Sequence, residues 1–198
     1  MPIAINGSGT ITGVSVGGLP DGIVDTDMIA AAAVTAPKRG TGSIIQVAST
    51  TKTDTFSSSE SAGNVSGPAI ALNFTATSTS NKLLIMANLF CGLSHGTERV
   101  GIILYAGGSV LSSAIGDANS TNRRLSMGGF NDQDNSYVCV SHSHLFTPAS
   151  TNEISYDYRL HNGRGATGTV YLNRQSTSNT GSEIGVGTST ITIMEIAG

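Results

Sequence analysis

The sequence is poor in charge. Asp, Glu, Lys and Arg together make up 12% of the 198 residues, and Trp is absent. Soluble proteins typically carry about a quarter charged residues, because surface charge keeps separate molecules in solution. A chain with so little charge and with abundant Gly, Ser and Thr is more typical of an assembly that covers part of its surface with copies of itself. We therefore expect a homo-oligomer.

Clusters of basic residues are also lacking. The formal net charge is −3, and the adjacent basic pairs are Lys38-Arg39 and Arg123-Arg124. A protein that binds DNA or RNA normally carries a face rich in Lys and Arg. We therefore expect no nucleic-acid partner.

Long apolar runs are missing as well. The opening residues, MPIAINGSGT, lack the basic and apolar regions of a signal peptide. No apolar run approaches the ~20 residues that cross a bilayer as a helix. We expect no membrane insertion, and synthesis in a cytoplasm.

Cysteine is scarce. Cys91 and Cys139 both fall in apolar runs, whereas disulfide frameworks belong to small, cysteine-dense secreted chains. We predict two buried thiols that act as small hydrophobic side chains.

Residues 1–42 differ in character from the rest of the chain. A strong turn signal lies at 19–22, and a helix of two or three turns is predicted between Asp25 and Pro37. A helix this short and rich in Ala needs a partner surface to be ordered. The segment therefore looks like an anchor. Its candidate attachment residues are Leu19, Pro20, Met28 and Ile29.

The pattern of residues 43–198 predicts a succession of short strands without helical patterns between them. This favours an all-β fold, and specifically an antiparallel jelly-roll sandwich. The dense apolar run Lys82–Cys91 indicates a strand that is buried on both faces, and the Ser-rich stretch Thr51–Gly67 indicates a long loop, extended in part. The predicted strands are Ser43–Thr50, Ala69–Thr77, Lys82–Cys91, Arg99–Ala106, Ser109–Ile115, Leu125–Phe130, Tyr137–Phe146, Glu153–Leu160, Thr167–Asn173 and Ser189–Ile196. The last of these alternates cleanly, so we expect the C-terminus to be held in a sheet.

Two stretches resemble known virus proteins. The N-terminal phrases GSGTITGVSVGGLPDG and DTDMIAAAAVTAPK resemble the openings of tail-fibre and virion structural proteins of marine and cyanobacterial phages. The phrases NKLLIMANL, EISYDYRL, GTVYLNRQSTSN and STITIMEIA resemble phage jelly-roll domains of the kind compared to trimeric TNF or C1q heads.

The resemblance implies a division of labour and a place of action. Residues 1–42 would attach the chain to other proteins of the virion, and residues 43–198 would form a trimeric jelly-roll head that faces a host surface glycan or protein. Fold-level analogy does not by itself identify a functional site.

One pair of residues invites a metal hypothesis. His142 and His144 are two apart in a predicted strand, so their side chains share a face with Cα atoms about 6–7 Å apart. Imidazole suits iron, zinc, copper or nickel, and three copies around a three-fold axis could share one ion. The alternative is that both are ordinary polar residues of an outer strand, and no cofactor is otherwise indicated.

Catalytic patterns are absent from the sequence: no GxSxG, HExxH or P-loop motif occurs. The acidic residues are scattered over loops, without the pairing that a glycosidase needs. We therefore expect a protein that is not an enzyme: a trimeric tail-fibre or appendage subunit. The alternatives are a capsid decoration or tail-adaptor protein and, more remotely, a hydrolase of surface glycans.

Overall fold

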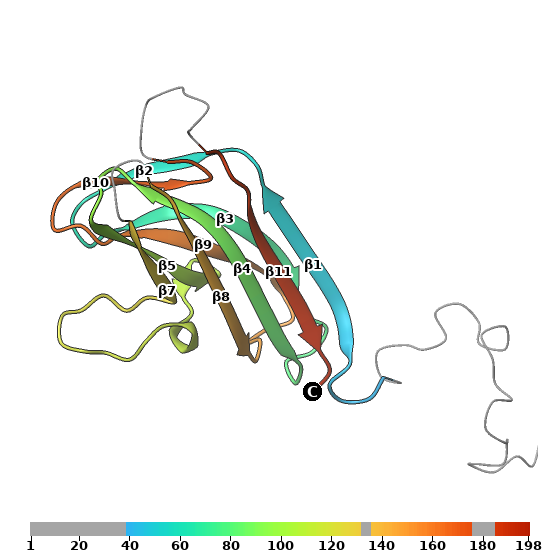
Figure 1. Cartoon of the computed structure of the whole chain (residues 1–198). Coiled ribbons are helices and arrows are strands. Elements are labelled where there is room, and N and C mark those ends of the chain that lie inside the picture. The colour runs from blue at the N-terminus through green and yellow to red at the C-terminus, as the bar shows by residue number, and fades with distance from the viewer. Residues whose placement is uncertain (1–38, 132–135, 176–184) are drawn as a thin grey trace, which may run out of the picture. The chain divides into compact units, whose positions relative to one another are not determined.

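The computed structural model describes residues 39–131, 136–175 and 185–198 (Figure 1). In these ranges the chain is built from antiparallel strands and one short 3-10 helix, η3. The elements are β1 (Ile44–Lys52), β2 (Phe56–Glu60), β3 (Val65–Thr75), β4 (Lys82–Leu93), β5 (Glu98–Ala106), β6 (Ser109–Val110), η3 (Ser112–Ala114), β7 (Met127–Asn131), β8 (Val138–Phe146), β9 (Glu153–Asn162), β10 (Gly168–Leu172) and β11 (Ser189–Ile196). The predicted all-β antiparallel sandwich is confirmed.

The first sheet runs in the order β1-β11-β4-β10-β2, with β8 on the other edge of β4. Because β4 has 12 residues, one of its edges pairs with β11 along its first part and with β10 at its end. The strands β1, β11, β4 and β8 are therefore direct neighbours, although they come from both ends and the middle of the chain.

The second sheet has the order β3-β9-β5-β6, with β7 also paired to β5. The long connection from Leu111 to Ser126, which contains η3, projects from this sheet (Figure 1). Within the described part of the chain, no helix is long and apolar enough to span a membrane.

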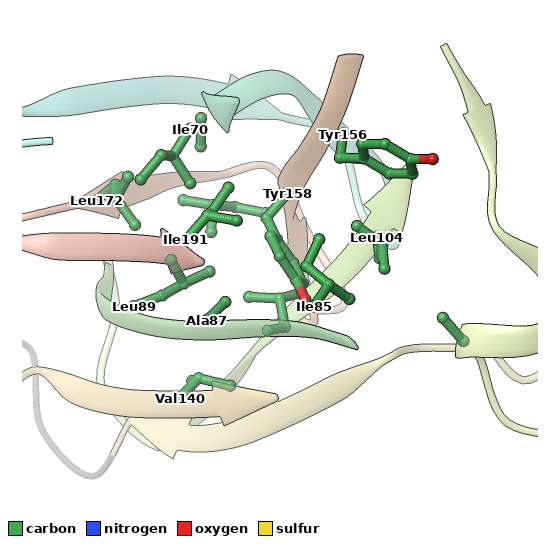
Figure 2. Packing of buried hydrophobic residues seen from close by; sticks show 14 of the residues in the cluster. Ile70, Ile85, Ala87, Leu89, Leu104, Val140, Tyr156, Tyr158, Leu172 and Ile191 are labelled. Carbon is green, nitrogen blue, oxygen red and sulfur yellow. The ribbon is translucent and has the colours of Figure 1, made fainter. Parts of the chain in front are cut away.

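The core lies between the two sheets and follows from the period of two along each strand. In β4 the alternate residues Leu83, Ile85 and Leu89 are fully buried in the core cluster that also contains Leu104 and Tyr158 of the second sheet. Figure 2 shows Ile85, Leu89, Leu104 and Tyr158 in this cluster. Each Leu or Ile buried in this way contributes about 1.5–3 kcal/mol to folding.

Most of the predicted strands are present with ends within two residues of the predicted ones, except that β3 begins four residues before the predicted Ala69. The loop predicted at Thr51–Gly67 is wrong, because this stretch contains β2 and the start of β3. Its Ser-rich strand β2 has little apolar alternation and is held by backbone pairing with β10. The strand predicted at Ser109–Ile115 shrinks to the two residues of β6, followed by η3.

Two burial predictions also need correction. Cys91 is a buried thiol, but Cys139 is exposed, because it points outward from β8 between the inward-facing Val138 and Val140. The predicted burial of β4 on both faces is wrong for the single chain: Leu84 and Met86 on its outer face remain partly exposed.

A buried carboxylate closes the sandwich beside the C-terminus. Glu195 of β11 is fully buried, and its two oxygens accept hydrogen bonds from the side chains of Gln46, Thr77 and Asn81 at 2.6, 2.8 and 2.6 Å, and from the Thr77 backbone N–H at 2.8 Å. Burial alone would raise the pKa of this carboxyl, but the hydrogen bonds outweigh burial and hold the pKa below its usual value. The network ties β1, β11 and the β3–β4 connection together.

Candidate functional site

The outer face of the first sheet is a candidate interaction surface. Inward side chains of β1, β11, β4 and β8 fill the core, so the intervening residues point away from the second sheet. Nothing in the described part of the chain covers these residues as the second sheet covers the inner face.

An apolar row crosses this face. Val47 is paired with Met194, Met194 with Leu84, and Leu84 with Leu145, so that four neighbouring strands each contribute one large apolar side chain at the same height. Val47 and Leu145, at the two ends of the row, are 54% and 53% exposed. Exposed apolar groups in a contiguous line are typical of a surface that meets a partner.

The next two rows along the strands carry no charge, and all their side chains except Met86 are polar. Hydrogen bonds join neighbours within them: Ser49 and Thr192 share one between their hydroxyls at 2.9 Å, and the Ser141 hydroxyl donates to Asn88 at 2.7 Å. We call the three rows together the uncharged face. It consists of Val47, Met194, Leu84, Leu145, Ser49, Thr192, Met86, Ser143, Thr51, Thr190, Asn88 and Ser141.

Charge begins only at the margin of this face. Lys82, in the next outward position of β4, donates a hydrogen bond to the Thr147 hydroxyl at 2.6 Å. The outer side of the second sheet differs: there Arg159 pairs with Asp157 at 2.8 Å and lies over the Tyr105 ring. The two outer surfaces of the sandwich therefore have different chemistry.

The histidine pair lies on the inner side of β8. The His142 and His144 rings stack with centroids 6.1 Å apart and planes 14° apart, which agrees with their predicted placement on one face. His142 Nδ1 shares a hydrogen bond with the Tyr158 hydroxyl at 2.8 Å, and His144 Nε2 shares one with the Ser113 hydroxyl at 3.0 Å. Each imidazole is thus engaged with the second sheet or with η3.

This environment favours neutral imidazoles. Burial lowers the pKa of both histidines, and the nearby charge of His144 lowers the pKa of His142 further. Two imidazoles that share an ion must aim a nitrogen each at a point about 2.1 Å away, whereas these rings lie parallel. Within the described residues, no group of three or more His, Cys, Asp or Glu side chains could hold a metal. Metal binding at this pair stays a prediction that requires both rings to turn.

The predicted attachment residues, Leu19, Pro20, Met28 and Ile29, lie outside the described residues. The uncharged face was not predicted from the sequence. A signal was present in the dense apolar run of β4, whose outward residues have no cover in the described chain. Its neighbours β1, β8 and β11 could not be assigned without the sheet order.

No protein-family model matches the chain, and no curated protein sequence matches it. Among solved structures, the chain is similar to a protein chain in the structure of infectious bursal disease virus strain Gt. The two chains are 14% identical, the match covers 77% of this chain and 38% of the viral chain, and the TM-score is 0.39. The crystal structure of the VP2 subviral particle of the same virus matches with 14% identity, 77% and 37% coverage, and a TM-score of 0.38. The chain thus spans about two fifths of the length of these proteins. A likeness this distant carries no inference about function.

Proposed function

We propose that the chain is a structural subunit of a phage virion that works as a homotrimer, with residues 43–198 as a jelly-roll head assembled through the uncharged face. Residues 1–42 would attach it to the virion as a tail-fibre or appendage subunit, and the role is assembly and display at a host surface without catalysis. The observation that carries the assembly role is the uncharged face. The phage setting, the number three and the attachment role rest on the resemblance of the sequence phrases.

The chemistry of the face suits a second copy of the same chain. Three copies that turn this face toward a common three-fold axis can meet there without burying a charge, which would otherwise cost several kcal/mol per unpaired ion. Hydroxyl and amide groups both donate and accept hydrogen bonds, so Ser49, Asn88 or Ser141 can pair with groups of a copy. An assembly of copies would also cover Leu84 and Met86, and so account for the dense apolar run of β4.

The size of the face is consistent with the centre of an interface. Four strands about 4.8 Å apart, with three outward rows about 7 Å apart, span roughly 400 Å². A stable interface buries about 800 Å² per partner. Beyond the two ends of the face lie further apolar side chains: Ile44 is 51% exposed, and Tyr137, stacked on Phe90, is 50% exposed. These residues extend the face toward the required area.

The test is the mass of the full chain in solution, measured by light scattering, for the wild type and for Leu145→Lys. We expect the wild type to form three copies of the 20.1 kDa chain. Leu145→Lys buries an unpaired ammonium group in the interface and is expected to weaken assembly at least tenfold, giving a monomer. Because Leu145 is exposed in the single chain, the fold should survive the change.

Ala71→Lys is the matched control. Ala71 is an exposed residue of β3 between the inward-facing Ile70 and Leu72, so the same charge is added to the outer side of the second sheet. This variant should keep the wild-type mass. A wild-type monomer at micromolar concentration, or equal dissociation of the two variants, would contradict the assembly role.

A further inference from the structure

A cavity of about 450 Å³, open to solvent, lies on the outer side of the second sheet between β5, β6 and the base of the β6–β7 connection. Its volume falls within the usual range of small-molecule sites, about 300–1,000 Å³. The lining residues are Ile103, Val110, Ser112, Ile115, Thr121, Asn122, Arg123 and Arg124.

The connection is fixed to the sheet at both ends. The Leu111 N–H donates to the Leu104 carbonyl at 3.0 Å, and the Ser126 N–H donates to the Ile102 carbonyl at 2.9 Å. The Gly116 N–H closes the loop on itself through the Leu125 carbonyl at 3.2 Å. Backbone hydrogen bonds therefore hold the ends of the cavity wall in place, which lowers the free-energy cost of ordering the wall when a ligand binds.

The charge of the lining has one sign. Arg123 and Arg124 line the cavity, and none of the lining residues is acidic. The one acid of the connection, Asp117, is not a lining residue. Among the described residues neither arginine forms an ion pair with a carboxylate. Burial, followed by the charge of Arg123, lowers the pKa of His161, which agrees with a positive local potential.

The rest of the lining divides into two kinds of group. Ile103, which is almost fully buried, belongs with Val110 and Ile115 to the apolar part. Ser112, Thr121 and Asn122 bring hydroxyl and amide groups that both donate and accept hydrogen bonds. A fitting ligand thus combines a carboxylate, several hydroxyls and an apolar face, and is small enough to fit within about 450 Å³.

We propose that this cavity binds a carboxylate-bearing monosaccharide, with Arg123 and Arg124 as the carboxylate-binding residues. Guanidinium groups bind carboxylates in a two-pronged geometry that strengthens and orients the contact. Arg124 is already oriented, because its Nε donates to the Gly116 carbonyl. The hydroxyls of the sugar would bond to Ser112, Thr121 and Asn122, and its C–H face or an acetamido methyl would pack on the exposed Val110 and the partly exposed Ile115.

Saturation-transfer NMR titrations of the full chain test this site. The probes are glucuronate and N-acetylneuraminate, which share the carboxylate but come from different polysaccharides, with glucose, N-acetylglucosamine and acetate as comparisons. We expect saturable binding of at least one acidic sugar in the millimolar range or tighter, and at least tenfold weaker binding of the neutral sugars and of acetate. The stronger of the two acids identifies the polysaccharide class.

Arg123→Gln should weaken binding of the acidic sugar about tenfold or more, because it removes a charge-assisted pair of hydrogen bonds. Arg124→Lys, which keeps the charge but loses the two-pronged geometry, should weaken it by a smaller factor. Arg99→Gln removes the same charge from an exposed residue outside the cavity and should leave binding unchanged.

Equal binding of neutral and acidic sugars, no binding of either acid, or wild-type affinity in Arg123→Gln would each overturn the proposal. The cavity lies within a single chain, so the site does not depend on assembly. A trimer that binds no acidic sugar would contradict this site alone, and a monomer that binds one would contradict the assembly role alone.

Discussion

Replacing Glu195 by Gln tests the polar network that closes the sandwich. The wild-type carboxylate accepts four hydrogen bonds of 2.6–2.8 Å from Gln46, Thr77 and Asn81, and it is fully buried. A Gln side chain has nearly the same shape but one oxygen only. If that oxygen lies near Thr77 and Asn81, the NH2 group of the new Gln side chain faces the NH2 group of Gln46. Two hydrogen-bond donors then oppose each other.

The size of the effect follows from the loss of charge. Hydrogen bonds to an ionised group contribute about 1.5–3 kcal/mol each, against about 0.5–1.5 kcal/mol for neutral pairs. Three weakened bonds and one opposed donor pair at a buried position should lower the free energy of unfolding by about 2–4 kcal/mol at neutral pH.

The pH dependence has a defined sign. The pKa of Glu195 is lower in the folded chain than its usual value, so the unfolded state binds the proton more readily. The contribution of the carboxylate is therefore complete above the unfolded pKa, about 4.3, and is lost as the pH falls through the folded pKa. Glu195→Gln cannot titrate, so the difference between the two proteins should shrink on acidification.

The assay is urea unfolding at matched protein concentration, because assembly makes apparent stability depend on concentration. Glu153→Gln is the control: Glu153 is exposed and accepts one hydrogen bond, of 3.3 Å, from Asn73. It should stay within about 0.5 kcal/mol of the wild type. A loss below about 0.5 kcal/mol for Glu195→Gln, or a difference that does not shrink toward low pH, would refute the reasoning.

Two further predictions concern β8 and its neighbour β4. Folding lowers the pKa of His142, so as the pH falls below about 6.5 this imidazole binds a proton more readily in the unfolded state than in the folded state. The free energy of unfolding should therefore decrease from pH 7.5 to 5.5. Urea unfolding should show a smaller decrease in His142→Gln than in the wild type, and an unchanged decrease in the control His95→Gln, an exposed position; equal decreases in all three would contradict this. The second prediction uses the Leu145→Lys variant, which we expect to be monomeric. In the native variant a thiol reagent should label the exposed Cys139. It should label Cys91, which is buried and has a raised pKa, only after the protein is denatured. Mass spectrometry that finds both thiols labelled in the native protein would contradict the burial of Cys91.

The part of the fold that could be predicted from the sequence is the part encoded by local alternation. The last strand, Ser189–Ile196, was predicted with its observed bounds, since a clean period of two points alternate residues into the core. Strand β2 was missed because a Ser-rich strand has almost no apolar signal and is held by backbone bonds to β10. Cys139 was predicted as buried because its run is apolar, but its parity within β8 points it outward.

The candidate sites depend on contacts that no local pattern contains. The apolar row exists only because Val47, Leu84, Leu145 and Met194 come to the same height on four neighbouring strands. The cavity in the same way needs Ile103 of β5 beneath the connection that carries Arg123. Each residue is ordinary in its own stretch of sequence, and the property arises from sheet order and register.

The central claim is that copies of this chain assemble through the uncharged face. Electron cryomicroscopy of the purified wild-type oligomer tests it most directly, because it shows which surface of each copy meets its neighbour. We predict three copies in which Val47, Leu84, Leu145 and Met194 are covered by an adjacent copy. A monomer, or an oligomer in which this row faces solvent in every copy, would contradict the account.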